Sequence, residues 1–115
     1  MSRTARDIPA LLAGYREAAK RTSDPSPRTA NKWASRLHAC YQLLREMEEG
    51  RNAITELIGD DDPHVRVWAA AHSLAWSTEN ARAALEELRE SDGPCSLDAK
   101  WTLREFDRGK LSFDY

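Results

Sequence analysis

A short stretch, GDDDPHVRVWAAAHSL at residues 59–74, constrains the fold more than any other part of the chain. Asp62 directly precedes Pro63, which is the order of an N-cap residue and a first helical residue. Asp60 and Asp61 add negative charge near the same helix N-terminus, where the helix dipole favours it. Apolar residues then fall on much of the helix circumference, so we expect this helix to pack on more than one side.

Helical periodicity runs through the rest of the chain. Apolar residues recur at intervals of three and four, and no segment shows the alternating period of a β-strand. The sequence therefore predicts an all-α fold with six helices, at about residues 8–21, 27–48, 51–58, 63–76, 78–91 and 97–109.

Several helix boundaries are predicted from single residues. Ser26 followed by Pro27 marks the start of the second helix, and Ser96 is expected to cap the last one. Gly50 is expected to end the second helix. Gly59 is expected to be the C′ residue of the third helix, the position at which glycine often ends a helix.

The periodicity also predicts which side chains face the core. Trp33 and Trp68 have core spacing on their helices. Trp76 stands at a helix end and is either a plug in the helical hairpin or an exposed anchor for a partner, since tryptophan is enriched at binding hot spots. In the last helix the residues expected to point inward are Leu97, Trp101 and either Leu103 or Phe106.

Two segments of similar pattern follow one another. AITEL at residues 53–57 recurs as ALEEL at residues 84–88, and Trp68 recurs as Trp101. The repeated unit is a helix, a tight turn and a second helix, which is typical of helical-repeat proteins. We expect a single domain over residues 1–115, with a leading helix pair (1–50), a repeat unit (51–76) and a second repeat-like unit (77–109).

The stretch AITELIGDDDPHVRVWAAAHSL resembles a HEAT-type repeat. The matching features are Leu57 at the end of the first helix, the turn from Asp60 to Pro63, and Val65-Arg66 at the start of the second helix. The resemblance implies a short right-handed array of antiparallel helical hairpins. It also implies that the turn aspartates cap helices and can pair with the arginine, and that the array offers a surface to another protein.

Residues 60–111 are also similar to an uncharacterised bacterial family of about this length, the domain of unknown function numbered two thousand and nineteen in its series. The shared segments are DPHVRVWAAAHSLAW, ENARAALEELRES and DAKWTLREFDRGKL. This family carries no agreed activity. The resemblance therefore implies a fold and transfers no function.

Size and composition set the broad class of protein. The chain has 115 residues, of which 41% are hydrophobic and 31% charged, which fits one globular domain. No apolar run approaches the ~20 residues of a membrane span, and the N-terminus lacks the apolar core of a secretory signal, so we expect a cytoplasmic protein. Cys40 and Cys95 are then reduced thiols, and Cys40 is expected to be a small buried hydrophobe.

No residue pattern predicts catalysis. His38, His64 and His72 are not spaced to share a metal ion, and Cys40 lies on a different helix face from His38. The adjacent side chains of residues 60–62 point in different directions, which disfavours a metal site. The five glycines are scattered rather than gathered in a phosphate-binding loop. We therefore expect no catalytic residue, no metal ligand and no cofactor.

Charge is distributed unevenly along the chain. Residues 1–47 carry nine basic and four acidic residues, whereas residues 48–115 carry eight basic and fifteen acidic residues. Complementary charge speeds the encounter of two proteins, and aromatic anchors slow their dissociation. The sequence therefore favours a protein-binding module, and within that class a bacterial immunity protein that covers the active site of a toxin, for example a basic nuclease domain. The expected binding residues are Glu48, Glu49, Asp60, Asp61, Trp76, Glu79 and Asp92.

Two other functions fit the sequence. An adaptor or regulatory subunit would present a similar surface within a larger complex. A nucleic-acid-binding protein would use the basic second helix, on which Arg28, Lys32, Arg36 and Arg45 are placed roughly on one side. The acidic second half disfavours this last function, because it repels nucleic acid. An enzyme is the least favoured class.

Overall fold

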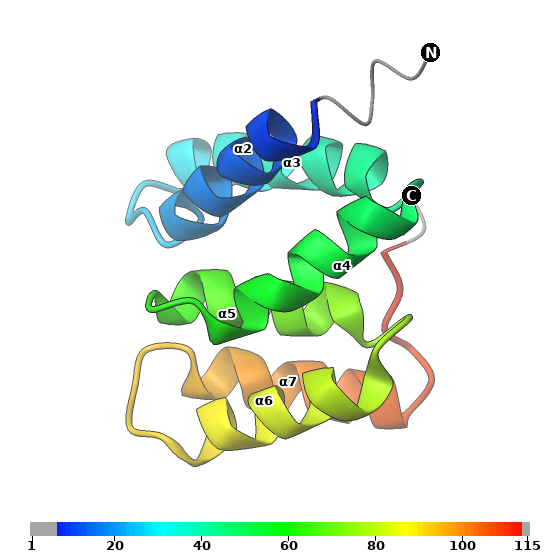
Figure 1. Ribbon diagram of the computed structural model, residues 1–115. Helices are drawn as coiled ribbons and strands as arrows, with labels where there is room; N and C mark the ends of the chain where they lie inside the picture. The colour runs from blue at the N-terminus through cyan, green and yellow to red at the C-terminus, as the bar shows by residue number, and fades with distance from the viewer. Residues whose placement is uncertain (1–6, 114–115) are drawn as a thin grey trace. The chain divides into compact units, whose positions relative to one another are not determined.

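The computed structural model of the protein describes residues 7–113, which form six α-helices and no strand, as predicted (Figure 1). None of the helices in this range is long and apolar enough to cross a membrane. A 3-10 turn, η1 (Leu57–Gly59), follows the third helix. The helices are α2 (Ile8–Arg21), α3 (Pro27–Leu44), α4 (Glu48–Glu56), α5 (Pro63–Ser73), α6 (Thr78–Glu90) and α7 (Ser96–Asp107).

Two helix starts follow the predicted cap chemistry. The Ser26 hydroxyl caps α3 and the Asp62 carboxylate caps α5, and each accepts a hydrogen bond from backbone N–H groups of its helix. A proline occupies the first helical position after each cap. The last helix differs from the prediction, because Cys95 occupies the cap position of α7. Ser96 is the first helical residue instead, and its hydroxyl donates to the carbonyl oxygen of Arg89 (2.8 Å).

The boundary between α3 and α4 also differs from the prediction. α3 ends at Leu44 and α4 begins at Glu48, so Gly50 lies inside α4 rather than after α3. The physical reason is a close approach of two backbone segments. A Cβ atom on Gly50 would lie 2.1 Å from the carbonyl oxygen of Leu44. Glycine is therefore required at position 50 by the tight connection between the two helices.

Gly59 does not have the left-handed conformation expected of a residue that ends a helix. It is the last residue of η1, and Asp60 follows it in an extended conformation. Gly109 is the only described residue with a positive φ angle (70°). Its N–H donates to the carbonyl oxygen of Phe106 (3.0 Å), so Gly109 ends α7 as predicted.

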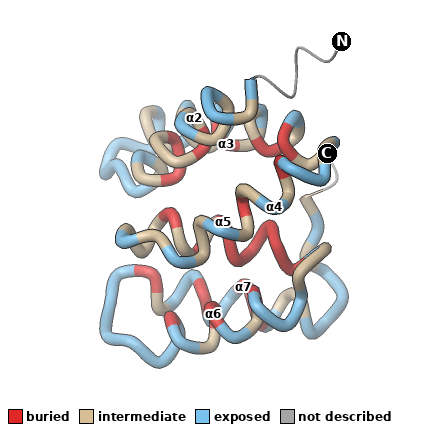
Figure 2. Tube along the Cα trace, in the orientation of Figure 1, coloured by how far each residue is buried: buried red, intermediate tan, exposed pale blue. Residues whose placement is uncertain are grey.

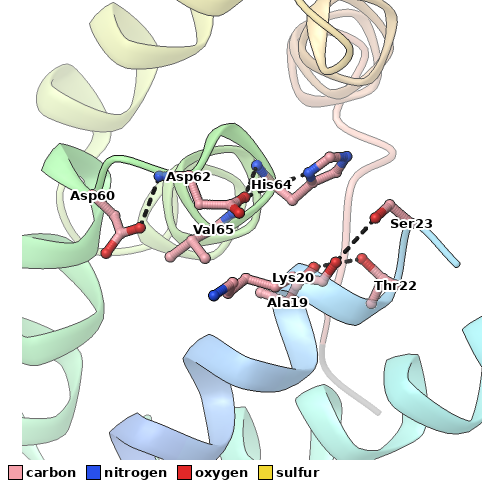
Figure 3. Close-up of polar contacts among 8 residues, drawn as sticks. All are labelled: Ala19, Lys20, Thr22, Ser23, Asp60, Asp62, His64 and Val65. Atoms are coloured by element: carbon pink, nitrogen blue, oxygen red, sulfur yellow. Dashed lines mark hydrogen bonds and ion pairs between the residues drawn. The ribbon is translucent and has the colours of Figure 1, made fainter.

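The contacts within the chain divide it into two compact units, Met1–Ile54 and Thr55–Tyr115, here called the N-terminal and the C-terminal unit. In the N-terminal unit α2 and α3 pack side by side as a hairpin (Figure 1). The hydroxyls of Thr22 and Ser23 donate to the carbonyl oxygens of Ala19 and Lys20 and close the last turn of α2 (Figure 3). The buried residues of the two helices are Tyr15, Ala18, Ala19, Leu37, Tyr41 and Leu44.

Helix α5 is the central helix of the C-terminal unit. It packs against η1, α6 and α7, and α6 packs against α7. Seven of its eleven residues are buried, and Figure 2 shows long buried segments along it. The prediction of a helix covered on more than one side is confirmed. The buried core of this unit consists of Val67, Ala70, Leu74, Ala81, Ala84, Leu85, Leu88, Cys95, Ala99 and Leu103.

The segment after α7 folds back onto α5. The ring of Phe113 meets the ring of His72 edge-on, with centroids 4.7 Å apart, and lies 6.5 Å from the ring of Trp68. Leu111 packs against the core of the same unit. His72 is therefore a buried core residue, and Trp68 is half-buried beside it. The sequence pattern of this segment is too short to predict the contact.

Candidate protein-interaction surface

Helix α7 carries two apolar rows, and one of them faces solvent. Ala99 and Leu103 belong to the buried core, and Phe106 packs against it. Leu97 and Trp101 lie four residues apart, hence on one helix face, and they are 77% and 55% exposed. The prediction that Leu97 and Trp101 point inward is therefore wrong.

The physical reason is the size of the residues that fit between closely packed helices. Ala99 lies at the centre of the inner row, and the helices that face α7 contribute Ala70, Ala81 and Ala84 to the same core. Such small side chains let the helices approach closely, and a core packed at normal density has no room for an indole ring. Trp101 therefore lies on the outer row.

Basic residues continue the outer row of α7. Arg104 and Arg108 follow Trp101 at intervals of three and four residues, and Lys100 flanks it. All three cations are exposed, and Arg108 approaches Glu105 only loosely (3.9 Å between Nη1 and Oε2). Two large apolar side chains and three cations thus share one surface, and the exposed acid Asp98 lies at its edge. We call it the α7 face, and it consists of Leu97, Lys100, Trp101, Arg104 and Arg108.

The α7 face is presented by a helix that is fixed near both ends. Arg82 of α6 donates to both carboxylate oxygens of Asp107 (2.8 and 3.1 Å), and these hydrogen bonds lower the pKa of Asp107. At the other end, the Ser96 hydroxyl binds the Arg89 carbonyl oxygen (2.8 Å). A partner that binds this face would therefore meet a preorganised helix.

The acidic residues predicted to bind a partner do not form one group. Asp61 and Asp92 are exposed in the turns before α5 and after α6, at the end of the C-terminal unit where α7 also begins (Figure 1). Glu79 is exposed at the opposite end, in the first turn of α6. Glu48 and Glu49 are exposed in the first turn of α4, in the N-terminal unit. Asp61 and Asp92 are thus the members of the set that lie at the end of the unit where α7 begins.

Asp60 has a structural role in the turn before α5 (Figure 3). Its Oδ2 atom accepts a hydrogen bond from the N–H of Asp62 (2.9 Å). Asp62 Oδ1 in turn accepts from the N–H groups of His64 (2.8 Å) and Val65 (3.4 Å). In the described part of the chain, no group of three or more His, Cys, Asp or Glu side chains could hold a metal ion. Asp62 therefore caps α5, and Asp60 stabilises the turn before it.

Arg66 connects this turn to the neighbouring helix. Its Nε–H donates to the carbonyl oxygen of Ile58 in η1 (3.1 Å), and its Nη2 group donates to Glu87 of α6 (2.9 Å). The HEAT-type resemblance implied a pairing between the turn aspartates and this arginine. The ion pair that the structure shows for Arg66 joins α5 to α6 instead.

Trp76 is half-buried and hydrogen-bonded. Its indole N–H donates to the hydroxyl of Thr55 (2.8 Å), which lies 3.2 Å from the hydroxyl of Ser73. Of the two roles expected for Trp76, the structure favours the plug over the exposed anchor. The exposed tryptophan is Trp101. Helix α7 has two apolar rows, and the sequence alone does not show which of them faces the core.

The thiols and histidines do not form a nucleophilic site. Cys95 is buried (1% exposed), and burial, with smaller contributions from the Asp98 and Asp62 charges, raises its pKa to about 11. Cys40 is half-buried rather than fully buried as expected, and burial raises its pKa as well. His38 stacks loosely on Tyr41, with ring centroids 5.8 Å apart. A thiol with a raised pKa is a poor nucleophile at neutral pH.

The two thiols should differ in reactivity. In the folded protein at about pH 8, we expect the thiol reagent DTNB to modify Cys40 and to leave Cys95 unmodified until a denaturant is added. With a pKa of about 11, only about one Cys95 thiol in a thousand is ionised at this pH, and it is also inaccessible. The Cys40→Ser variant serves as the control and should show no native reaction. Two thiols that react at equal rates in the folded protein would contradict this assignment.

The fold and its surfaces define an all-α protein of helical hairpins with an exposed apolar and basic face on its last helix. No protein-family model matches the chain, and no curated protein matches it in sequence. Its structure is similar to the crystal structure of the protein RPA1889 from Rhodopseudomonas palustris CGA009, with a TM-score of 0.84. The match covers 97% of this chain and 98% of that chain at 21% sequence identity. At this identity, the comparison shows a shared fold and carries no statement about function.

Proposed function

We propose that this protein is a non-enzymatic module that binds another protein through the α7 face. The observation that carries the proposal is the exposure of Leu97 and Trp101 side by side on a fixed helix. Single exposed apolar residues are ordinary at protein surfaces, whereas adjacent large ones are typical of binding sites. Tryptophan is enriched at interface hot spots because its ring buries a large area on contact.

The state of the reactive groups supports binding rather than catalysis. His72 lies buried beneath Phe113, and the Asp62 carboxylate is occupied as a helix cap. The Cys95 thiol is buried with a raised pKa. An open hollow at the start of α6 contains a single ionisable side chain, and its lining residues are Ser77, Thr78, Glu79 and Asn80. None of these arrangements pairs a nucleophile with a base.

Within this class, we propose a bacterial immunity protein that covers the active site of a cognate toxin. The acidic turns support this role, because Asp61 and Asp92 lie at the end of the C-terminal unit where α7 begins. Leu97 is in the first turn of α7, at that same end of the unit. The basic surface of a toxin such as a nuclease would gain encounter rate from the acidic turns, the cations of the α7 face would match acidic side chains of the toxin, and affinity would come from the apolar pair.

The proposal is tested with two matched variants. Trp101→Ser removes the exposed indole from the α7 face. Leu43→Ser removes an exposed apolar side chain (52% exposed) from α3, far along the sequence. After the partner has been co-purified from the native host and identified, we expect Trp101→Ser to weaken its binding by at least about thirtyfold, the effect of a hot-spot residue of about 2 kcal/mol. Leu43→Ser should leave the affinity within about twofold.

Isothermal titration calorimetry with the purified partner measures both affinities. Unchanged binding by Trp101→Ser would contradict the use of the α7 face. Equal losses in both variants would point to a general effect on folding, which circular dichroism detects. The immunity role has its own test, which is co-expression with the protein encoded by the adjacent upstream gene. Rescue of growth supports it, whereas a stable complex with a harmless protein supports the adaptor role.

A further inference from the structure

Helix α3 has no acidic residue. Residues 25–45 contain no Asp or Glu, although 19 of the 115 residues of the chain are acidic. Arg28, Lys32 and Arg36 recur every fourth residue along this helix, and all three are exposed. With a rise of 1.5 Å per residue, neighbouring cations lie ~6 Å apart along the helix axis and the row spans ~12 Å. We call Arg28, Lys32 and Arg36 the α3 row.

Three cations lie over the ring of Trp33. Its centroid lies 4.7 Å from the Arg36 guanidinium carbon, 5.9 Å from the Lys32 ammonium nitrogen and 5.1 Å from the guanidinium carbon of Arg21 on α2. The electron-rich face of an indole attracts cations and offsets part of their mutual repulsion. Arg21 is also paired with Glu17. The Trp33 ring therefore holds a cluster of positive charge at the surface of the N-terminal unit.

The charge of the α3 row is not compensated by ion pairs. Among the residues that the structure describes, no acidic side chain forms an ion pair with Arg28, Lys32 or Arg36. Arg45, which was expected to share this side, lies over the ring of Tyr41 (5.0 Å) and is not part of the row. The positive N-terminal end of the α3 dipole lies next to Arg28 and adds to the potential there. The row therefore favours a ligand with several negative charges.

We propose that the α3 row binds the phosphate backbone of nucleic acid without reading its base sequence. This activity goes beyond protein binding at the α7 face and uses another helix. A protein partner would be expected to bury an apolar core at the interface, with charges mostly at the rim. The other exposed residues between the cations are Asn31 and Ser35, which are small and polar. Rows of Arg and Lys with polar neighbours are typical of contacts with phosphates.

The geometry also indicates a duplex rather than a single strand. Single-strand binding proteins stack bases on free aromatic rings. Three cations already lie over the Trp33 ring, and a base that stacked on it would have to compete with them. The contacts that remain are with phosphates, which DNA and RNA duplexes share. Both duplexes are therefore included in the test.

The test is a salt titration of binding measured by fluorescence anisotropy. Labelled DNA and RNA duplexes of about 20 base pairs are titrated with the full chain from about 25 to about 200 mM KCl. Three phosphate contacts predict a slope of about −3 in a plot of log K against log salt concentration. The variant Arg28→Gln/Lys32→Gln/Arg36→Gln should bind at least about tenfold more weakly at the lowest salt, with a slope near zero. Arg28→Gln alone, at a side chain outside the Trp33 cluster, should reduce the slope by about one.

The matched control removes exposed cations from the other unit, outside the α7 face. Arg89→Gln/Lys110→Gln changes the net charge by the same amount as Lys32→Gln/Arg36→Gln in the α3 row. The Arg89/Lys110 variant should keep the wild-type affinity for both duplexes within about twofold, whereas the Lys32/Arg36 variant should reduce the salt slope by about two. The proposal is overturned if the wild-type protein fails to bind at the lowest salt, or if the two double variants lose binding equally. It is also overturned if polyglutamate of equal charge competes as well as an unlabelled duplex, because the surface would then recognise acidic protein.

Discussion

Replacing Gly50 by alanine is expected to lower the free energy of unfolding of the N-terminal unit by about 3 kcal/mol or more. The added Cβ would lie 2.1 Å from the carbonyl oxygen of Leu44 and 2.8 Å from its carbonyl carbon. These are backbone atoms, which cannot move aside as the end of a flexible side chain can. The connection between α3 and α4 would have to open, and the buried Leu44 side chain would be displaced with it.

Gly59→Ala provides the matched control for this prediction. Nothing lies within 4 Å of a Cβ at position 59, and Gly59 does not have a positive φ angle. Alanine at such a position is expected to leave stability unchanged or to raise it by up to about 1 kcal/mol, because it restricts the unfolded chain. Urea unfolding followed by circular dichroism measures both variants. Equal stability of the two variants would contradict the close contact between Gly50 and Leu44.

The second large effect is expected from Leu85→Ala in the core of the C-terminal unit. Leu85 is 0% exposed on α6 and belongs to the core cluster that α5, α6 and α7 share. Its truncation removes buried apolar surface and leaves a cavity, so we expect a loss of about 3 kcal/mol in the free energy of unfolding. The midpoint of urea unfolding should fall accordingly.

Leu97→Ala makes the same chemical change at an exposed position of the neighbouring helix. Leu97 is 77% exposed, and we expect its truncation to change the free energy of unfolding by no more than about 0.5 kcal/mol. The pair of variants therefore compares the loss of stability at a buried leucine with the loss at an exposed leucine of the same unit. A larger loss for Leu97→Ala than for Leu85→Ala would contradict the orientation of α7.

The sequence predicted correctly the two helix starts that are marked by a cap residue and the proline after it. Ser26 and Asp62 each precede a proline, and the structure uses both as caps. Such signals are readable because the hydrogen bonds involved lie within three residues of the cap. Gly109 is predictable for a similar reason, since it ends α7 with a positive φ angle.

Features that depend on how one element packs on another were not predicted. Because glycine often ends helices, the sequence predicts a helix end at Gly50, whereas the structure places it within α4 against Leu44. The contact of Phe113 with His72 joins residues far apart in the chain, and no periodicity indicates it. In both cases the information lies in the packing of one element on another.

The candidate surface was predicted only in part. Periodicity placed Leu97 and Trp101 on one face of the last helix, which is correct, but it could not tell which of two apolar rows faces the core. Net charge along the chain suggested an acidic binding surface, yet the exposed apolar pair has cations beside it and acids only at its edge. Charge counted along a sequence does not report which charges share a face. The α7 face, rather than Trp76 and the dispersed acids, therefore provides the proposed binding residues.

The most direct measurement is photo-crosslinking from the α7 face in the native host, with Trp101 left in place. The photoreactive amino acid p-benzoylphenylalanine is placed at Arg104, one turn from Trp101, in one variant and at Ala83, an exposed position of α6, in a matched variant. If the α7 face binds a protein, illumination yields one crosslinked species of defined mass from position 104 and none from position 83. An absence of crosslinks at position 104, or the same products from both positions, would contradict the central claim that this face binds another protein.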